Sequence, residues 1–230
     1  RSTKKRAAVT ISSTSPDAQQ CEVTGVTQAA GQVTGVETSK GAIACDKLGI
    51  VVAGHSGVLA EMAGFRLPVE SVALQALVSE PIKPCMDVVV MANTVHGYMS
   101  QSDKGEMVIG GGADGFNNYT QRGSFHHAEE TVRALVETFP MISRLKMLRW
   151  WGGIVDMTGD RSPILSKTPL DNCFINCGWG TGGFKAIPGS GFGMAELIAK
   201  GASSLTDEFS MWRFKEGKFI DESVAAGVAH

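Results

Sequence analysis

The residues best suited to chemistry gather in one glycine-rich stretch, residues 173–200. The stretch opens with an apolar run, residues 173–177, that predicts a short buried strand. Four glycines follow within six positions: Gly178, Gly180, Gly182 and Gly183. Glycine lets a backbone approach a flat ligand closely, and the start of the next helix offers unpaired N–H groups with partial positive charge. Together with the charge of Lys185, this pattern predicts a receptor for a flat or anionic ligand rather than an ordinary strand-to-helix connection.

The elements on either side must hold this turn in place. We expect the following helix to begin after Pro188 and to cover residues 191–200. Residues 147–170 predict a strand, a turn at Asp160 and Arg161, and a second strand.

Most of the remaining chain predicts strands. Residues 21–53 favour a three-stranded meander, with turns at Gly31 and at residues 40–41, that leads into a buried strand over residues 49–53. Residues 86–113 favour three further antiparallel strands joined by a hairpin. Antiparallel strands in succession indicate the wall of a second domain.

Two helices interrupt these strands. A short helix is expected over residues 56–64. The clearest helix covers residues 124–139, where Ser124 is suited to cap the amino end and an apolar stripe repeats at helical spacing. His126 and His127 are adjacent and therefore point apart, so we interpret both as solvated side chains and not as a metal pair.

Three patterns have more than one interpretation. Residues 69–80 have helix-like spacing, yet their alternate apolar positions also fit a strand. Residues 110–112 are three glycines, but they lack the spacing and the Lys-Ser/Thr pair of a phosphate loop, so they favour a glycine-rich strand end. His55 has a side chain that can act as a base, but we expect it to cap the helix that begins near Ser56.

Composition sets outer limits on function. The chain has 230 residues, of which 43% are hydrophobic and 28 are glycine, and its net charge is −2. These values suit a globular α/β or α+β protein and give no general attraction for nucleic acid or anionic membranes. The five cysteines are scattered, so we interpret them as free thiols of a reducing cytoplasm. Residues 1–20 lack a secretory signal and predict a disordered leader.

Two motifs carry a resemblance to a known family. The run CGWGTGGFKAIPGSG at residues 177–191 and the run RWWGGIVDMTGDRSPI at residues 149–164 resemble the beta subunits of heterotetrameric sarcosine oxidases. Those subunits belong to the flavin amine oxidases of the D-amino-acid oxidase group, and the resemblance extends from about Cys21 to Leu197. It implies an α/β (α+β) fold, with a partial FAD-binding domain of the D-amino-acid oxidase type and a mainly antiparallel substrate-domain sheet.

The resemblance also divides the chain. It implies that residues 21–66 and 147–200 are parts of the FAD-binding domain and that residues 67–146 are the substrate domain. Residues 201–230 would be a C-terminal interaction arm that packs against neighbouring subunits. Residues 1–20 do not look like the family.

The resemblance assigns roles to five residues. The backbone of Val23 would touch the adenine, Gly54 would lie close to the nucleotide, and Gly180, Gly183 and Lys185 would contact the flavin. Lys185 would also be the catalytic residue, because its cation can pair with a substrate carboxylate or stabilise negative charge on the reduced ring. FAD is the implied cofactor, and the covalent FMN site of the family is expected upstream of this chain. No metal site is expected.

The implied reaction is the flavin-dependent oxidation of sarcosine, or a similar imino acid, to glycine and formaldehyde. Tetrahydrofolate can take up the one-carbon unit in this family, and the implied partners are alpha, gamma and delta subunits in the cytoplasm, with neither nucleic acid nor membrane. We find no GxGxxG with a following acidic residue anywhere in the chain; in this family that fingerprint lies at the amino end of a longer chain and binds the FAD pyrophosphate, so we expect a truncated, C-terminal portion. Two alternatives stay open: a non-catalytic binding or interaction module with this fold, and another imino-acid oxidoreductase such as a proline dehydrogenase subunit.

Overall fold

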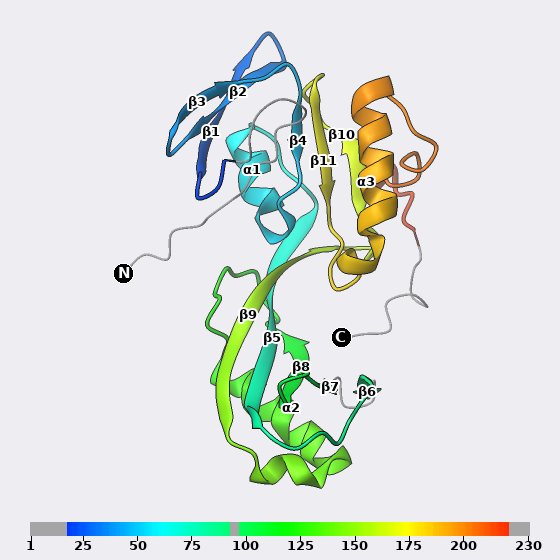
Figure 1. Cartoon of the computed structure of the whole chain (residues 1–230). Helices are drawn as coiled ribbons and strands as arrows, with labels where there is room; N and C mark the ends of the chain where they lie inside the picture. Colours follow the sequence, from blue (N-terminus) through cyan, green and yellow to red (C-terminus); the bar gives the residue numbers. More distant parts are fainter. Residues whose placement is uncertain (1–17, 93–96, 221–230) are drawn as a thin grey trace. The chain divides into compact units, whose positions relative to one another are not determined.

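Figure 1 shows the computed structural model, which describes residues 18–92 and 97–220. The chain divides into two compact units, one before Val72 and after Ile154, the other between these limits. Strands β5 (Val69–Pro81) and β9 (Met147–Thr158) each begin in one unit and end in the other. Most of the predicted leader and the last ten residues of the predicted arm lie outside the described residues.

The first unit opens with the predicted three-stranded meander. Strands β1 (Val23–Ala29), β2 (Gln32–Thr38) and β3 (Gly41–Ala44) form an antiparallel sheet in the order β1-β2-β3. The first hairpin turns at Ala30 and Gly31, whose φ angles are +51° and +80°. Two successive positive φ angles match the right-handed twist of the strands, which is why a small residue pair is suited to this turn.

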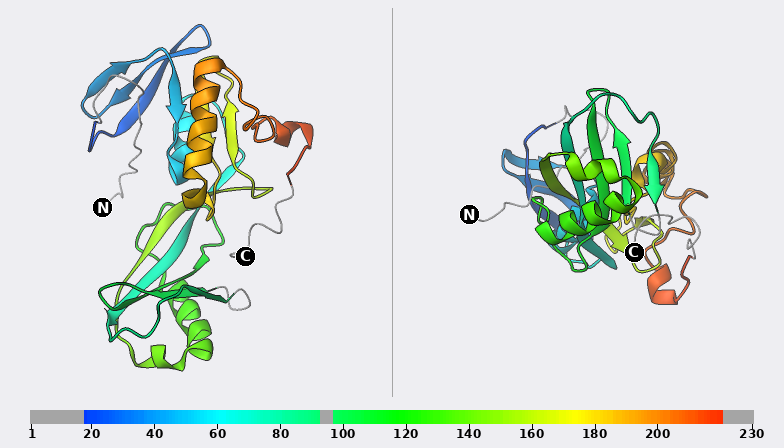
Figure 2. Two further views of the ribbon diagram at one scale, coloured as in Figure 1. Left: turned by 45° about the vertical axis from the view of Figure 1, so that its right-hand side comes forward. Right: turned by 90° about the horizontal axis from the view of Figure 1, so that it is seen from below.

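A second sheet in this unit carries the glycine-rich stretch. Strand β11 (Cys173–Cys177) lies between β10 (Ile164–Lys167), to which it is antiparallel, and β4 (Leu48–Ile50), to which it is parallel. Helix α3 (Gly183–Lys200) lies along this sheet in Figure 1 and in the left view of Figure 2, and buries Met194 and Leu197 against Phe174. Strand β4 ends at Ile50, so the strand predicted over residues 49–53 is shorter than expected.

The short helix expected after β4 is present. The 3-10 turn η1 (Ala53–His55) leads directly into α1 (Ser56–Met62). His55 occupies the N-cap position, but its side chain makes no capping hydrogen bond, so its position was predicted correctly and its bonding was not. Leu59 and Ala60 of α1 are fully buried in the core beneath the meander.

The second unit is a five-stranded sheet with a helix on one face. The order is β6 (Val90–Ala92), β7 (Gly97–Gln101), β8 (Glu106–Ala113), β5 and β9, and the described pairings of β5 with β8, β6 with β7 and β7 with β8 are antiparallel. Helix α2 (Phe125–Thr138) covers one face, and the 3-10 turn η3 (Pro140–Arg144) follows at the proline that ends α2. The core of this second unit is formed by Leu77, Met99, Met107, Ile109, Ala128, Leu135 and Ile142.

The ambiguous segment, residues 69–80, is a strand. Its fully buried positions include Ala73, Gln75 and Leu77, whereas Leu74 and Val78 on the alternate positions are half-buried. Of the two interpretations left open, the strand is the one that the structure shows, and its buried face is the partly polar one. The mixed α/β (α+β) architecture with a mainly antiparallel second sheet is confirmed.

Candidate functional site

The predicted binding stretch begins on a completely buried strand. All five residues of β11 are buried, and β11 is the central strand of its sheet. The chain after Cys177 therefore leaves the sheet at the carboxyl end of a central strand, which is the edge where open α/β sheets place their ligands.

The turn after β11 requires glycine at two positions. Gly178 and Gly180 have φ angles of +75° and +51°, in the left-handed region that glycine favours. A Cβ atom on Gly178 would lie 2.7 Å from the methyl group of Thr158, and one on Gly180 would lie 2.8 Å from the sulfur of Met157. The conformation of the turn and its close packing against the end of β9 both exclude larger side chains.

The helix after the turn begins earlier than we predicted. We expected a start near residue 191, but α3 begins at Gly183 and contains Pro188. The φ angle of proline is already helical, so the ring is accommodated here at the loss of one backbone hydrogen bond. The correction matters for chemistry because it places Gly183 and Lys185 in the first turn of the helix.

The start of α3 has donors that no side chain satisfies. Gly182 is the N-cap residue, and no side chain caps the first N–H groups. Phe184 is 89% exposed, and Lys185 is exposed and forms no ion pair within the described part of the chain. The first turn of α3 thus presents partial positive charge, a free cation and an uncovered aromatic ring.

The sequence of this turn also has the glycine spacing of a known dinucleotide-binding motif. Residues 178–183 read GWGTGG, which has G-x-G-x-x-G spacing after a strand and before a helix. The dinucleotide fingerprint also needs a parallel strand after the helix. No strand follows α3 among the residues described up to 220, so the described chain shows only the spacing of that fingerprint and not its second strand.

The end of β9 lies directly beneath the turn. Asp156 is 2% exposed, and its Oδ2 atom accepts a hydrogen bond from the Gly178 N–H at 2.6 Å. Its backbone carbonyl accepts one from the Gly180 N–H at 2.9 Å. The sequence analysis missed this residue, although a single acidic residue in a mainly apolar strand was a usable signal.

The two remaining predicted site residues belong to other elements of the same unit. Val23 begins β1 and is 4% exposed. Gly54 lies in η1, is buried, and its carbonyl accepts a hydrogen bond from the Ser71 hydroxyl at 2.6 Å. The structure therefore brings Gly180, Gly183 and Lys185 into one turn and leaves Val23 and Gly54 on separate elements.

A buried ion pair, also missed from the sequence, supports this region. The guanidinium of Arg213 donates to both carboxylate oxygens of Asp160, at 2.7 and 2.9 Å, and both side chains are 3% exposed. Burial alone would raise the pKa of Asp160, but hydrogen bonds from Arg213, Ile220 and Ser162 lower it overall. The pair fastens the short helix α4 (Arg213–Glu216) to the turn between β9 and β10. The described part of the predicted arm is thus joined to its own unit.

The second unit contains another strand-to-helix connection, between β8 and α2. Gln75 bridges its two ends: the side-chain NH₂ donates to Asp114 at 3.1 Å, and the side-chain oxygen accepts from the Ser124 N–H at 2.8 Å. Asn118 donates to the other oxygen of Asp114 at 2.7 Å. As predicted, Ser124 is the N-cap of α2 and accepts from the His127 N–H at 3.4 Å.

One of the two helix-start histidines was interpreted wrongly. His126 is exposed, as expected, but the side chain of His127 is only 21% exposed. Its ring nitrogens lie 3.2 Å from Asp114 and 3.3 Å from Glu130. Because Asp114 is itself buried, His127 is a member of the polar network of this connection and not a solvated side chain.

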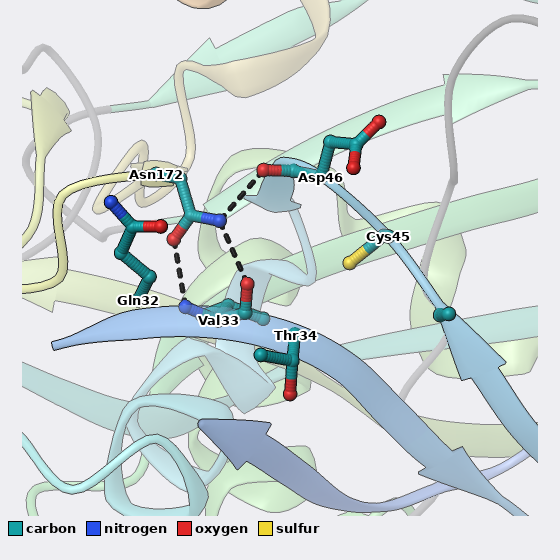
Figure 3. Close-up of a pocket in the computed structure, with 7 residues that line it drawn as sticks. Gln32, Val33, Thr34, Cys45, Asp46 and Asn172 are labelled. Atoms are coloured by element: carbon teal, nitrogen blue, oxygen red, sulfur yellow. Dashed lines mark hydrogen bonds between the residues drawn. The ribbon is translucent and has the colours of Figure 1, made fainter. Parts of the chain in front are cut away.

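A separate hollow of about 400 Å³ lies beside β2, as Figure 3 shows. The Asn172 side chain accepts from the Val33 N–H at 2.7 Å and donates to the carbonyls of Val33 and Asp46 at 2.8 and 2.6 Å. The hollow is lined by Gln32, Val33, Thr34, Ala44, Cys45, Asp46 and Asn172. None of the predicted site residues lines it, so we assign it to the packing of the meander.

The cysteines behave as the sequence predicts. All five are free, and Cys173 and Cys177 are buried. Burial raises the pKa of Cys173 to about 11 and raises that of Cys177 further. Thiols of this kind are neither nucleophiles nor metal ligands at neutral pH.

Metal-ligand clusters and membrane-spanning helices are both absent from the described part of the chain. The described residues contain no group of three or more His, Cys, Asp or Glu side chains that could hold a metal ion. Within residues 18–92 and 97–220, no helix is both long and apolar enough to cross a membrane.

Comparisons with known proteins agree with this geometry. A family model described as FAD dependent oxidoreductase matches residues 18–197. Over 212 residues the chain is 79% identical to the sarcosine oxidase subunit beta of Rhodobacter capsulatus. The matched segment covers 92% of this chain and 51% of that protein. The corresponding subunit of an Arthrobacter species is 54% identical over 213 residues, covering 92% and 53%. The chain therefore spans about half the length of these curated relatives.

Solved structures give the same fold. The L-proline dehydrogenase of P. horikoshii has a TM-score of 0.76 and 27% identity, covering 87% of this chain and 55% of that one. The glycine oxidase of Geobacillus kaustophilus has a TM-score of 0.72 and 20% identity, covering 83% and 51%, and supports the fold alone.

Proposed function

Because the chain belongs to the FAD dependent oxidoreductase family, we propose that it is part of a multi-subunit oxidase that oxidises sarcosine to glycine and formaldehyde. The observation that carries this proposal is the 79% identity to a sarcosine oxidase subunit beta across 92% of the chain. Since the chain matches about half of that protein, the activity proposed is that of the whole subunit in its complex.

The residues at the start of α3 fit a flavin nucleotide. Their uncapped N–H groups and Lys185 supply positive charge without any acidic side chain in the first turn, which suits a phosphate or an electron-rich ring. Gly178 and Gly180 have positive φ angles and no side chains, so at these two positions the backbone of the turn can approach a ligand closely. FAD, when bound, would supply the electron acceptor for amine oxidation. The chain itself would have to bind and orient the substrate and exclude water from the site.

Lys185 is the residue that we propose for catalysis. Its Nζ atom forms no ion pair in the described chain, and Lys185 lies in the first turn of α3 with the proposed flavin contact Gly183, just after the proposed contact Gly180. A cation in this position can orient the carboxylate of an amino-acid substrate or stabilise negative charge that develops nearby. We further propose that the backbone of Val23 and Gly54 contribute to the nucleotide site.

The domain roles follow from the same proposal. The unit that holds β4, β10, β11 and α3 would be the FAD-binding part, and the five-stranded sheet would be the substrate domain. FMN, tetrahydrofolate, the alpha, gamma and delta subunits and a cytoplasmic location are proposed from the resemblance alone. The proposed covalent FMN site lies outside this chain, so no residue here is assigned to it.

One alternative has an observation in its favour. The L-proline dehydrogenase of P. horikoshii shares 27% identity over most of the chain, so oxidation of proline or another imino acid is the second candidate. Both substrates are secondary amines that carry a carboxylate, and Lys185 would serve either.

The proposal can be tested by absorption spectroscopy. The 230-residue chain would be purified alone, and also after co-expression with the portion of the R. capsulatus subunit that it does not match. Sarcosine or L-proline would then be added without oxygen. Bleaching of a flavin band by sarcosine supports the proposal, and bleaching by proline alone supports the alternative. No flavin in either preparation would contradict both and favour a non-catalytic binding module.

A further inference from the structure

Asp156 stands out as a buried carboxylate without a cation. It lies near the end of β9 in the first unit and is 2% exposed. No Lys or Arg forms an ion pair with it within the part of the chain that the structure describes. A buried charge without a counter-ion is costly, so its hydrogen-bond partners must explain its presence.

Those partners are the backbone of the glycine turn. The carboxylate accepts a hydrogen bond from the N–H of Gly178 at 2.6 Å, and the backbone carbonyl of the same residue accepts from the N–H of Gly180 at 2.9 Å. The Trp179 N–H also bonds the carboxylate. One residue therefore receives three consecutive N–H groups of the turn, a large share of its donors.

Neighbouring residues fix the same turn by contact. Thr158 and Met157 fill the space beneath Gly178 and Gly180, so the turn cannot sink toward β9 without a clash. Asp156 prevents the opposite movement, because its acceptors pull the backbone toward β9. Packing thus limits movement of the turn toward β9, and the hydrogen bonds to Asp156 limit its movement away from β9.

The ionisation of Asp156 separates this role from general stability. Burial raises the pKa of Asp156, and hydrogen bonds from the Gly178 and Trp179 amides only partly oppose the shift. A raised pKa means that folding disfavours the charged form, so the charge does not contribute to global stability at neutral pH. An amide in its place is therefore tolerated by the fold while its bonding to the turn changes.

We propose that Asp156 is a positioning residue for the ligand-binding turn, holding the backbone of residues 178–180 so that the start of α3 and Lys185 meet the ligand in one orientation. The role of Asp156 in ordering the turn stands on the geometry, and the identity of the ligand rests on the proposed function.

The test is amide hydrogen exchange on the 230-residue chain, comparing Asp156→Asn with the wild type. The Asn side chain keeps one oxygen but presents an NH₂ group and no charge to the turn. We expect exchange at Gly178 and Trp179 to quicken by about 10-fold, with the urea midpoint unchanged or higher. Asp171→Asn, which removes an exposed carboxylate just before β11, is the matched control and should leave both readouts unchanged.

Three outcomes separate the two proposals. Quicker exchange confined to the turn, with flavin binding in the co-expressed complex weakened about 10-fold, supports both. Quicker exchange without flavin binding by either protein supports the positioning role and contradicts the proposed function. Unchanged exchange at the turn, or a loss of protection over the whole unit with a lower midpoint, overturns the positioning role. If Asp156→Asn does not fold, Asp156→Glu, which keeps the charge and displaces the oxygens, serves the same comparison.

Discussion

The molecule joins a strand to a helix in two contrasting ways. In the first unit, residues 178–182 connect β11 to α3 through glycines, with no side-chain cap on the helix. In the second unit, residues 114–124 connect β8 to α2 through a network in which Gln75 and Asp114 take part and Ser124 caps the helix. The N–H groups of residues 178–180 bond Asp156, but the first turn of α3 that follows has no side-chain cap, whereas the first turn of α2 is capped by Ser124.

This difference is the reason why we propose the first connection as a binding feature and interpret the second as a structural one. In the 114–124 connection the Ser124 cap and the bonds of Gln75 to Asp114 and to the Ser124 N–H join the start of α2 to its sheet. A helix start with free donors, a free lysine and a rigid glycine turn is ready to receive an anion. The four predictions below test the contrast, in decreasing order of their expected effect on the free energy of unfolding.

The largest effect is expected where the first unit depends on a buried charge pair. Arg213→Met leaves the buried Asp160 carboxylate without its cation, and breaking such a pair costs about 3–5 kcal/mol. Urea unfolding should show this loss, whereas Arg161→Met, at an exposed neighbouring position, should change the free energy of unfolding by less than about 0.5 kcal/mol. A small effect of Arg213→Met would mean that the Asp160–Arg213 ion pair does not stabilise the unit.

The pH dependence of the wild type supplies the control for this prediction. The pKa of Asp160 is lowered in the folded state, so its contribution to stability is present above the unfolded pKa of about 3.9 and is lost as the pH falls through the folded pKa. Arg213→Met should remove this acid-side loss. If the free energy of unfolding fell equally with decreasing pH in both proteins, Asp160 would not be the group responsible for the loss.

The second unit should lose stability when its network loses its bridge. Gln75→Leu leaves the Ser124 N–H without its partner and removes one of the two side chains that contact Asp114 Oδ1, His127 being the other; we expect this to cost about 1–3 kcal/mol. Gln121→Leu is the matched control, because Gln121 lies in the same connection and its side chain is exposed. Equal effects of the two substitutions on urea unfolding would contradict a structural role for the network.

The cap of α2 should contribute less. Ser124→Ala removes the acceptor for the His127 N–H, and the 3.4 Å length of this bond places the cost at about 0.5–1 kcal/mol. Ser190→Ala within α3 should change the free energy of unfolding by only a few tenths, since α3 has no serine cap to lose. If thermal unfolding gave the same shift for both, the two helix starts would not differ as described.

The sequence predicted local features well and long-range partners poorly. The glycine turn, the meander and the Ser124 cap depend on neighbouring residues, so their patterns were readable. The Asp160–Arg213 pair joins residues 53 positions apart, and no local pattern encodes such a pairing. The start of α3 was misplaced because Pro188 was read as a barrier, although its φ angle is compatible with a helix.

The smallest effect on stability, and the sharpest test of the contrast, is expected at Lys185. Its side chain is exposed and unpaired in the described chain, so Lys185→Met should change the free energy of unfolding by less than about 0.5 kcal/mol. In the co-expressed complex the same substitution should weaken flavin binding or slow amine oxidation by about 10-fold or more, because a charge facing the ligand is lost. Lys200→Met removes an equal charge from the far end of the same helix, where it pairs with Glu196, and should leave flavin binding and amine oxidation intact. Equal losses from both variants would mean that net charge, rather than the position of Lys185 beside the open turn, governs binding.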